Sequence, residues 1–177
     1  MPAVSAVFTL LVMNMLRVDA VYLKPGDFCI ALRPTIVKTV LGSCVTITMY
    51  SARTKIGAAC HALLPTCRED QGPQCSTGTC QTASRYVECI IPEMARRMQE
   101  KGMVLSELEI KLFGGADMMM ESLADHQRVG SQNVLKSKML LARLGMTIKS
   151  SDVGGAAGRK LIFDTRSGDV WIKRLIP

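Results

Sequence analysis

Aromatic side chains are scarce in this sequence: Phe, Trp and Tyr make up 5% of its 177 residues. So few rings argue against a protein that stacks the bases of single-stranded nucleic acid. The 22 Lys and Arg residues outnumber the 15 Asp and Glu residues, for a net charge of +7, but they are scattered rather than clustered. This pattern favours an acidic protein partner over a nucleic acid or a membrane surface.

Long apolar runs are also missing. Residues 1–16 carry no charged side chain, but they are fewer than the roughly 20 that a membrane span needs, and Asn14 interrupts them. No basic segment precedes them, so neither a signal peptide nor direct membrane insertion is indicated. We expect residues 1–20 to be a loosely held N-terminal extension, or the product of a start placed too early. Residues 21–177 are expected to form one domain.

No two of the seven cysteines have the CxxC spacing of common metal and redox sites. Their odd number favours reduced thiols in a cytoplasm over a disulfide framework. We expect no metal and no cofactor, and interpret Cys29, Cys60 and Cys89 as small buried apolar residues. The full set is Cys29, Cys44, Cys60, Cys67, Cys75, Cys80 and Cys89.

Period-2 patterning and turn residues predict mainly strands. Apolar and polar side chains alternate over residues 45–50, a polar turn follows, and residues 56–64 form the return strand of a hairpin. A second hairpin is predicted near the C-terminus, and residues 66–83 form a polar loop. Hairpins therefore dominate the predicted α+β fold.

Two helices are predicted among these strands. Apolar residues at helical spacing indicate the first over residues 87–98, where Pro92 marks a kink or a boundary. The second runs from about Ser131 to Leu144, with Gly145 placed to cap its C-terminus.

The first hairpin contains the most informative pair of residues. A turn centred on Arg53 places Cys44 directly opposite His61, with Cβ atoms about 4.5–5.5 Å apart. An imidazole at this distance can take the thiol proton, and an ion pair would lower the thiol pKa from about 8.5. Gly42 and Ser43 allow a sharp turn before the cysteine, where backbone N–H groups can face an oxyanion.

Other interpretations of these residues remain open. A cysteine at a strand start is more often buried filler, and His126 lies in a polar stretch where we expect it to be solvated. Gly114 and Gly115 either bring the backbone close to the site or form a simple tight turn. A binding module, a redox-sensing thiol protein and a cysteine-rich metal site are the alternative functions. A basic docking face is a further possibility, against an ordinary solvated hairpin, at Arg159, Lys160, Lys173 and Arg174.

Short motifs along the chain carry a resemblance to a known family. The most specific are Leu41-Gly42-Ser43-Cys44-Val45, then Ala59-Cys60-His61, then Lys111-Leu112-Phe113-Gly114-Gly115-Ala116. Together, and in this order, they resemble the CheD family of chemoreceptor glutamine deamidases, over about residues 21–175. The other matching parts are Lys24-Pro25-Gly26, Val129-Gly130 with Asn133, Asp152 with Gly154-Gly155, Gly158-Arg159-Lys160, and Phe163-Asp164 with Gly168.

The resemblance implies a cytoplasmic enzyme that converts selected glutamines of methyl-accepting chemotaxis receptors to glutamates. It implies Cys44 as the nucleophile, His61 as the general base and Thr39 as the residue that orients the pair. It also implies a single-domain α/β sandwich fold, related to the cysteine-dependent deamidase toxins of the cytotoxic necrotizing factor type. Receptor cytoplasmic helices and a CheC-type phosphatase are the implied partners, and a non-catalytic adaptor that binds both is the alternative function.

Overall fold

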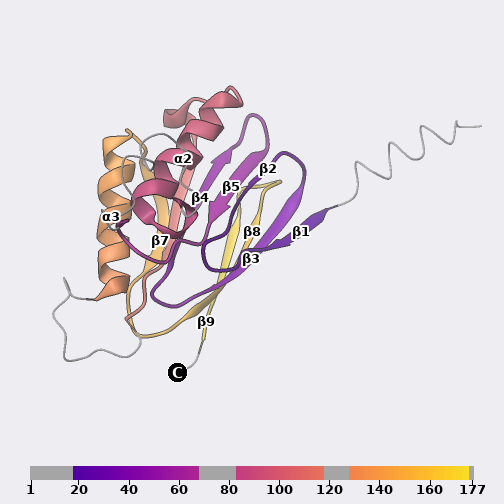
Figure 1. Ribbon diagram of the computed structural model, residues 1–177. Coiled ribbons are helices and arrows are strands. Elements are labelled where there is room, and N and C mark those ends of the chain that lie inside the picture. The colour runs from indigo at the N-terminus through magenta and orange to yellow at the C-terminus, as the bar shows by residue number, and fades with distance from the viewer. Residues whose placement is uncertain (1–17, 68–82, 118–127, 176–177) are drawn as a thin grey trace, which may run out of the picture.

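The computed structural model describes residues 18–67, 83–117 and 128–175. Two β-sheets pack face to face, and two helices cover the outer face of one of them, so that the chain forms three layers (Figure 1). This arrangement confirms the predicted α+β sandwich with two main helices. The predicted extension falls largely outside the described residues, whose first strand begins at Asp19.

The five-stranded sheet lies in the middle of the three layers. Its strands, in spatial order, are β2 (Phe28–Ala31), β5 (Ile56–Cys60), β4 (Val45–Ser51), β6 (Glu109–Gly114) and β7 (Ile148–Val153). The four-stranded sheet contains β1 (Asp19–Tyr22), β3 (Thr35–Leu41), β8 (Arg159–Asp164) and β9 (Val170–Arg174). The pairs β1–β3 and β6–β7 are parallel, and the other neighbours are antiparallel.

Strand β4 is buried along its whole length because it has a layer on each side. Val45, Ile47 and Met49 point toward the helices, whereas Tyr50 packs against the four-stranded sheet. The side chains that alternate along this strand therefore face two apolar cores, rather than a core on one side and solvent on the other. Both predicted hairpins are confirmed, as β4–β5 and as β8–β9.

Helix α2 (Val87–Glu100) buries six residues at helical spacing, and α3 (Val129–Arg143) packs beside it. Pro92 lies exposed inside α2 and does not mark a boundary. Gly145 follows the end of α3 with a φ of 68°, as expected of a glycine that ends a helix in the left-handed region. The chain also forms short 3-10 turns at Ala83–Arg85 and Leu105–Glu107.

Strand β7 was not predicted. Three of its six residues are exposed Lys and Ser side chains, which do not give the alternating pattern of a half-buried strand. Its place at the sheet edge, where one side has no strand neighbour, tolerates this polar sequence.

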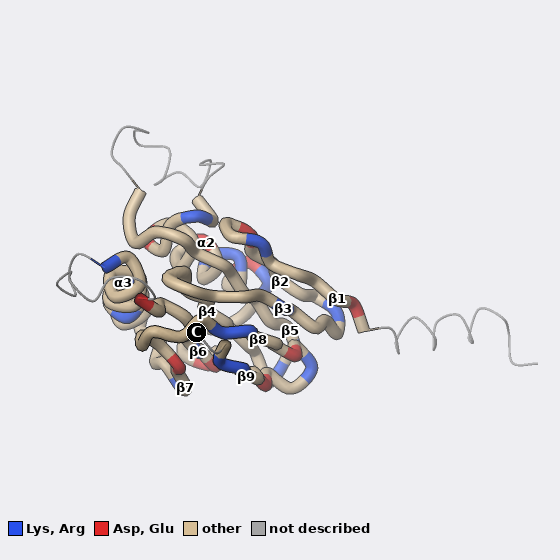
Figure 2. Tube along the Cα trace, turned by 90° about the horizontal axis from the view of Figure 1, so that it is seen from below, with Lys and Arg blue, Asp and Glu red and all other residues tan. Residues whose placement is uncertain are grey.

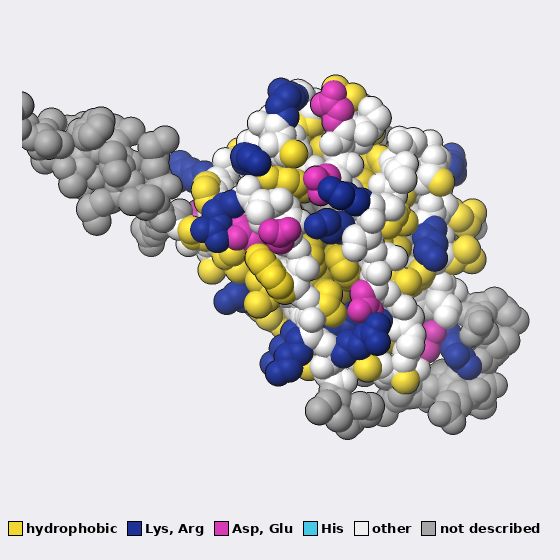
Figure 3. Space-filling view, turned by 180° about the vertical axis from the view of Figure 1, so that it is seen from behind, with side chains coloured by type: hydrophobic (Ala, Val, Ile, Leu, Met, Phe, Trp, Pro, Cys, Tyr) yellow, Lys and Arg dark blue, Asp and Glu magenta, His cyan; other side chains and the backbone are white. Residues whose placement is uncertain are grey.

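Basic residues occur on many elements (Figure 2), and one face of the molecule mixes basic, acidic and apolar side chains (Figure 3). The basic docking face considered above is wrong in its composition. Arg159 is 2% exposed, and Arg174 pairs with Asp152, while Lys160 and Lys173 are exposed cross-strand neighbours. In the part of the chain that the structure describes, no helix is long and apolar enough to cross a membrane.

The core between the sheets can be tested at Phe163, which is fully buried on β8. We expect Phe163→Ala to lower the free energy of unfolding by about 3–5 kcal/mol, because it leaves a cavity between the sheets. Urea denaturation followed by circular dichroism measures this loss. Trp171→Ala on β9 is the control, since Trp171 is 53% exposed, and should cost less than about 1 kcal/mol. Equal losses would contradict this account of the core.

Candidate active site

Cys44 and His61 lie on the same face of the five-stranded sheet, but they are not directly opposed. The hairpin pairs Val45 with Ala62 and Thr48 with Ala59, so that the residue opposite His61 is Thr46. The predicted register is therefore wrong by two residues, and Cys44 and His61 are diagonal neighbours. A two-residue shift preserves the face, because side chains alternate with period two. A diagonal pair remains within reach of side chains as long as histidine.

The turn before β2 holds the backbone of His61. Gly26 donates its N–H to the His61 carbonyl at 2.8 Å, and His61 donates its own N–H to the Asp27 carbonyl at 2.8 Å. Gly26 has a φ of 88°, which a residue with a side chain rarely adopts. The Lys24-Pro25-Gly26 motif thus forms a turn that fixes the strand end carrying the imidazole.

Thr39 reaches His61 from the other sheet. Its Oγ1 donates to the Leu23 carbonyl at 2.9 Å and lies 2.8 Å from Nδ1 of His61. Since the hydroxyl has one proton and gives it to Leu23, its oxygen accepts from Nδ1–H. We infer that Nδ1 carries the imidazole proton, which leaves Nε2 unprotonated and able to act as a base.

Burial favours the neutral form of both partners of the pair. It raises the pKa of the half-buried Cys44 thiol, against the opposing effect of its own backbone N–H. It lowers the pKa of His61, although the Leu23 carbonyl and the charge of Asp27 act in the opposite direction. The ion pair expected from the sequence is therefore not favoured at rest. The arrangement suits a neutral thiol beside an imidazole whose unprotonated Nε2 is able to accept a proton.

The turn after β6 packs directly on the loop that contains Cys44. Gly115 donates its N–H to the Cys44 carbonyl at 2.8 Å, and Ala116 donates to the Gly42 carbonyl at 2.8 Å. Gly114 has a φ of 103°, and a Cβ added there would overlap the Cys44 carbonyl oxygen. A Cβ on Gly115 would overlap the Val134 side chain. A side chain at Gly114 would therefore push this turn away from Cys44, and one at Gly115 would push it away from α3.

Arg159 joins the two sheets beside this turn. Its buried guanidinium donates to the carbonyls of Gly114 at 3.0 Å and Gly154 at 2.6 Å, and Nε donates to Asp152 at 2.9 Å. Asp117, at the end of the same turn, accepts hydrogen bonds from Gly130 N–H and the Ser131 hydroxyl at the start of α3. The turn is thus held from β8, from β7 and from α3.

Sequence reasoning missed two polar residues of this site. Asn133, on α3, is fully buried and donates to the carbonyls of Ser43 and Leu63, each at 2.9 Å. Arg159 was interpreted as a surface cation although it is buried. Both fall within motifs of the family resemblance, and that was the available signal.

Several sequence predictions concern residues outside this site. Cys60 is buried under the helices, whereas Cys44 packs against the core between the sheets, so the two thiols lie on opposite faces. The described part of the chain has no group of three His, Cys, Asp or Glu side chains placed to hold a metal ion. His126, Cys75 and Cys80 lie outside the described residues.

Comparison with known proteins agrees with the motifs. Residues 63–174, more than half of the chain, match the family model described as CheD chemotactic sensory transduction. The chain belongs to the CheD family. Relatives aligned over most of the chain are a probable chemoreceptor glutamine deamidase CheD 2 of Geobacter sulfurreducens and a probable chemoreceptor glutamine deamidase CheD of Maridesulfovibrio salexigens. The Geobacter protein is 43% identical over 90% of this chain and 92% of its own length. The Maridesulfovibrio protein is 42% identical over 92% of this chain and 95% of its own length.

The CheD family also contains more distant relatives of this chain. A probable chemoreceptor glutamine deamidase CheD of Methanococcus vannielii is 31% identical over 85% of this chain and 92% of the relative. The family model begins after His61, but the Geobacter alignment leaves only a tenth of the chain outside it. Positions 44 and 61 therefore lie within the region shared with that CheD relative.

The state of the Cys44 thiol can be measured by its alkylation. We expect the rate of iodoacetamide modification at Cys44 to rise with pH, as mass spectrometry of its peptide can follow. The pH midpoint of this rise should be higher in the folded protein than for the same cysteine in urea. The physical reason is the raised pKa of the buried thiol, since only the thiolate reacts. A midpoint below the urea value would instead indicate a preformed thiolate–imidazolium pair.

Proposed function

We propose that this CheD protein deamidates glutamine side chains of methyl-accepting chemoreceptors, with Cys44 as nucleophile and His61 as general base. The observation that carries the proposal is the His61 imidazole, which shares a sheet face with Cys44 and whose Nδ1 is engaged by Thr39 at 2.8 Å. A base held in one tautomer beside a thiol is the arrangement required for cysteine nucleophilic catalysis. The names of the relatives supply the substrate class.

The first step forms a bond between sulfur and carbon. Nε2 of His61 takes the proton from Cys44 Sγ, and the sulfur attacks the carbonyl carbon of the glutamine amide. The negative charge moves to the amide oxygen, which accepts hydrogen bonds from backbone N–H groups at Ser43 and Cys44. No acceptor among the described residues takes up either N–H group, apart from the Sγ of Cys44 beside its own N–H.

The remaining steps release both products. The imidazolium of His61 gives its proton to the amide nitrogen, the carbon–nitrogen bond breaks, and ammonia leaves a thioester on Cys44. His61 then takes a proton from water, whose oxygen attacks the thioester carbon. The carbon–sulfur bond breaks, glutamate is released, and the thiolate regains its proton from His61. The net reaction is hydrolysis of one side-chain amide.

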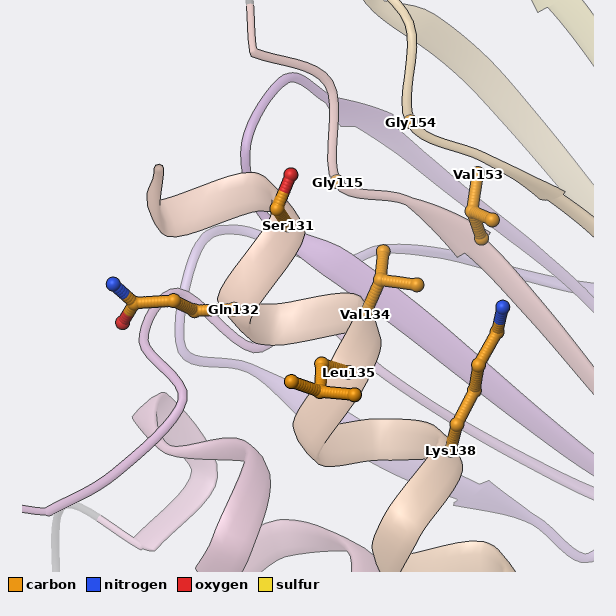
Figure 4. Close-up of a pocket in the computed structure, with 8 residues that line it drawn as sticks. All are labelled: Gly115, Ser131, Gln132, Val134, Leu135, Lys138, Val153 and Gly154. Atoms are coloured by element: carbon orange, nitrogen blue, oxygen red, sulfur yellow. The ribbon is translucent and has the colours of Figure 1, made fainter. Parts of the chain in front are cut away.

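A pocket beside the loop of Gly42, Ser43 and Cys44, here called the nucleophile loop, is the proposed binding site for a receptor helix. It has a volume of about 620 Å³ and lies between α3 and the ends of β6 and β7 (Figure 4). Gly115, whose N–H contacts the Cys44 carbonyl, forms part of its wall. Val134, Leu135 and Val153 give it an apolar lining, and Lys138 adds a positive charge at the same opening. This combination suits an amphipathic helix with acidic groups.

The proposal includes the cellular setting and a second partner. Methyl-accepting receptors present their modified glutamines on cytoplasmic helices, so we place the protein in the cytoplasm. The resemblance to the CheD family implies a CheC-type phosphatase as a further partner, and the proposal includes it.

The decisive test is ammonia release from a purified receptor cytoplasmic fragment. We expect Cys44→Ala to reduce the rate at least about 1,000-fold, because no other group replaces the nucleophile. Mass spectrometry should locate the glutamines converted to glutamate by the wild-type protein alone. Cys29→Ala is the matched control, since Cys29 packs against the same core, and it should keep the wild-type rate. Full activity of Cys44→Ala would refute the proposed nucleophile, and binding of the fragment without ammonia release would favour the adaptor function.

If this pocket is the receptor-binding site, a substitution in it should change KM for the receptor rather than kcat. Leu135 is 61% exposed beside the pocket, and we expect Leu135→Ala to raise KM for the receptor fragment about fivefold to tenfold, with kcat within about twofold. Ile162→Ala is the control. It removes an exposed apolar side chain from β8, in the four-stranded sheet, and should leave KM unchanged. An unchanged KM for Leu135→Ala would exclude this pocket as the receptor-binding site.

A further inference from the structure

Three consecutive carbonyl groups of the nucleophile loop each accept a hydrogen bond from the neighbouring elements. Those of Gly42 and Cys44 are held by backbone N–H groups of the turn after β6, each at 2.8 Å. The middle one, of Ser43, depends on a side chain: Asn133 Nδ2 donates to it at 2.9 Å. Ser43 O belongs to the same peptide as Cys44 N–H. Asn133 therefore holds the peptide that precedes the nucleophile.

This bond fixes the direction of the Cys44 N–H group. In a planar trans peptide the N–H points opposite to the carbonyl oxygen. With Ser43 O directed toward α3, the Cys44 N–H is directed away from α3. It lies beside the Cys44 Sγ, where a bound amide would develop negative charge.

The same amide group also holds the chain segment that carries the base. Nδ2 of Asn133 donates its second hydrogen to the Leu63 carbonyl at 2.9 Å, two residues after His61. An amide nitrogen has two donor hydrogens, so both are used. One fully buried side chain thus connects the segments that follow β3 and β5.

The unpaired side-chain oxygen of Asn133 indicates that an asparagine is needed here for the two hydrogen bonds that its amide nitrogen donates. Oδ1 is buried and has no hydrogen-bond partner among the described residues, an arrangement that costs free energy. Rotating the amide by half a turn would place this oxygen against two carbonyl oxygens, so its orientation is fixed. An aspartate would present two acceptors to the same carbonyls, and a serine has one hydrogen for two acceptors.

We propose that Asn133 is a positioning residue for the deamidation, holding the Ser43–Cys44 peptide so that the Cys44 N–H faces the oxyanion of the tetrahedral intermediate. The proposal rests on the proposed function, and it adds a residue that contacts neither the substrate nor the thiol. Its effect is expected on the transition state, where the oxyanion exists, and not on the binding of the receptor.

Two Asn133 variants test this role by separating chemistry from binding and from thiol reactivity. We expect Asn133→Leu and Asn133→Ala to lower kcat for ammonia release about 100-fold, the usual effect of losing one oxyanion donor. KM for the receptor fragment should change by less than about twofold. Iodoacetamide alkylation of Cys44 should fall far less than kcat, because displacement of iodide forms no oxyanion and senses the Cys44 N–H only through the thiol pKa. If the leucine variant does not fold, the alanine variant decides.

Ser137→Ala is the matched control. Ser137 is fully buried one turn further along α3, and its hydroxyl donates to the Asn133 backbone carbonyl at 2.7 Å. This variant removes a buried hydrogen bond from the same helix without touching Ser43, and it should keep kcat within about twofold. Thermal unfolding of all variants accounts for general loss of stability.

The outcomes separate this inference from the proposed function. Wild-type kcat in a folded Asn133 variant overturns the inference alone. An equal loss of kcat in Ser137→Ala, or a loss of alkylation rate parallel to that of kcat, also overturns it, because the role would then be general support of the fold. Wild-type protein that releases no Cys44-dependent ammonia overturns the proposed function, and this inference with it.

Discussion

The close approach of the Gly114–Gly115 turn to the loop of Cys44 is the constraint on which the site depends. It requires two consecutive residues without side chains, because a Cβ on Gly114 would overlap the Cys44 carbonyl and one on Gly115 would overlap Val134. Once the turn is this close, its N–H groups satisfy two carbonyls of the loop. Arg159 supports it from the second sheet, and Asp117 continues it to the start of α3. Helix position and loop conformation are therefore linked through one short segment.

The sequence predicted those features that depend on local pattern. Alternation over β4 and a polar turn were enough to place Cys44 and His61 on one face. The exact pairing was not predictable, because it depends on the turn, where Lys55 adopts a φ of 58° that a non-glycine residue rarely takes. Arg159 and Asn133 were beyond pattern analysis, since their burial depends on carbonyl acceptors that only the folded chain brings together.

Burial has a second effect on the Cys44 thiol, the proposed nucleophile. Oxidants and alkylating agents react with thiolates, so a thiol whose pKa is raised by burial is protected while no substrate is bound. His61, with its pKa lowered, stays available as a base under mildly acidic conditions in which an ordinary histidine begins to charge. The pair therefore combines a stable resting thiol with a base that needs no prior deprotonation.

Thr39 comes from the four-stranded sheet, whereas Cys44 and His61 flank β4 and β5 of the five-stranded one. The partners that β3 hydrogen-bonds on one side, and the arginine that supports the glycine turn, come from β8, near the end of the chain. During synthesis, the segments carrying the thiol and the imidazole emerge long before the strand that completes their surroundings. The surroundings of Cys44 and His61 are therefore complete only with the hairpin of β8 and β9, and a growing chain carries both side chains before the elements that orient them.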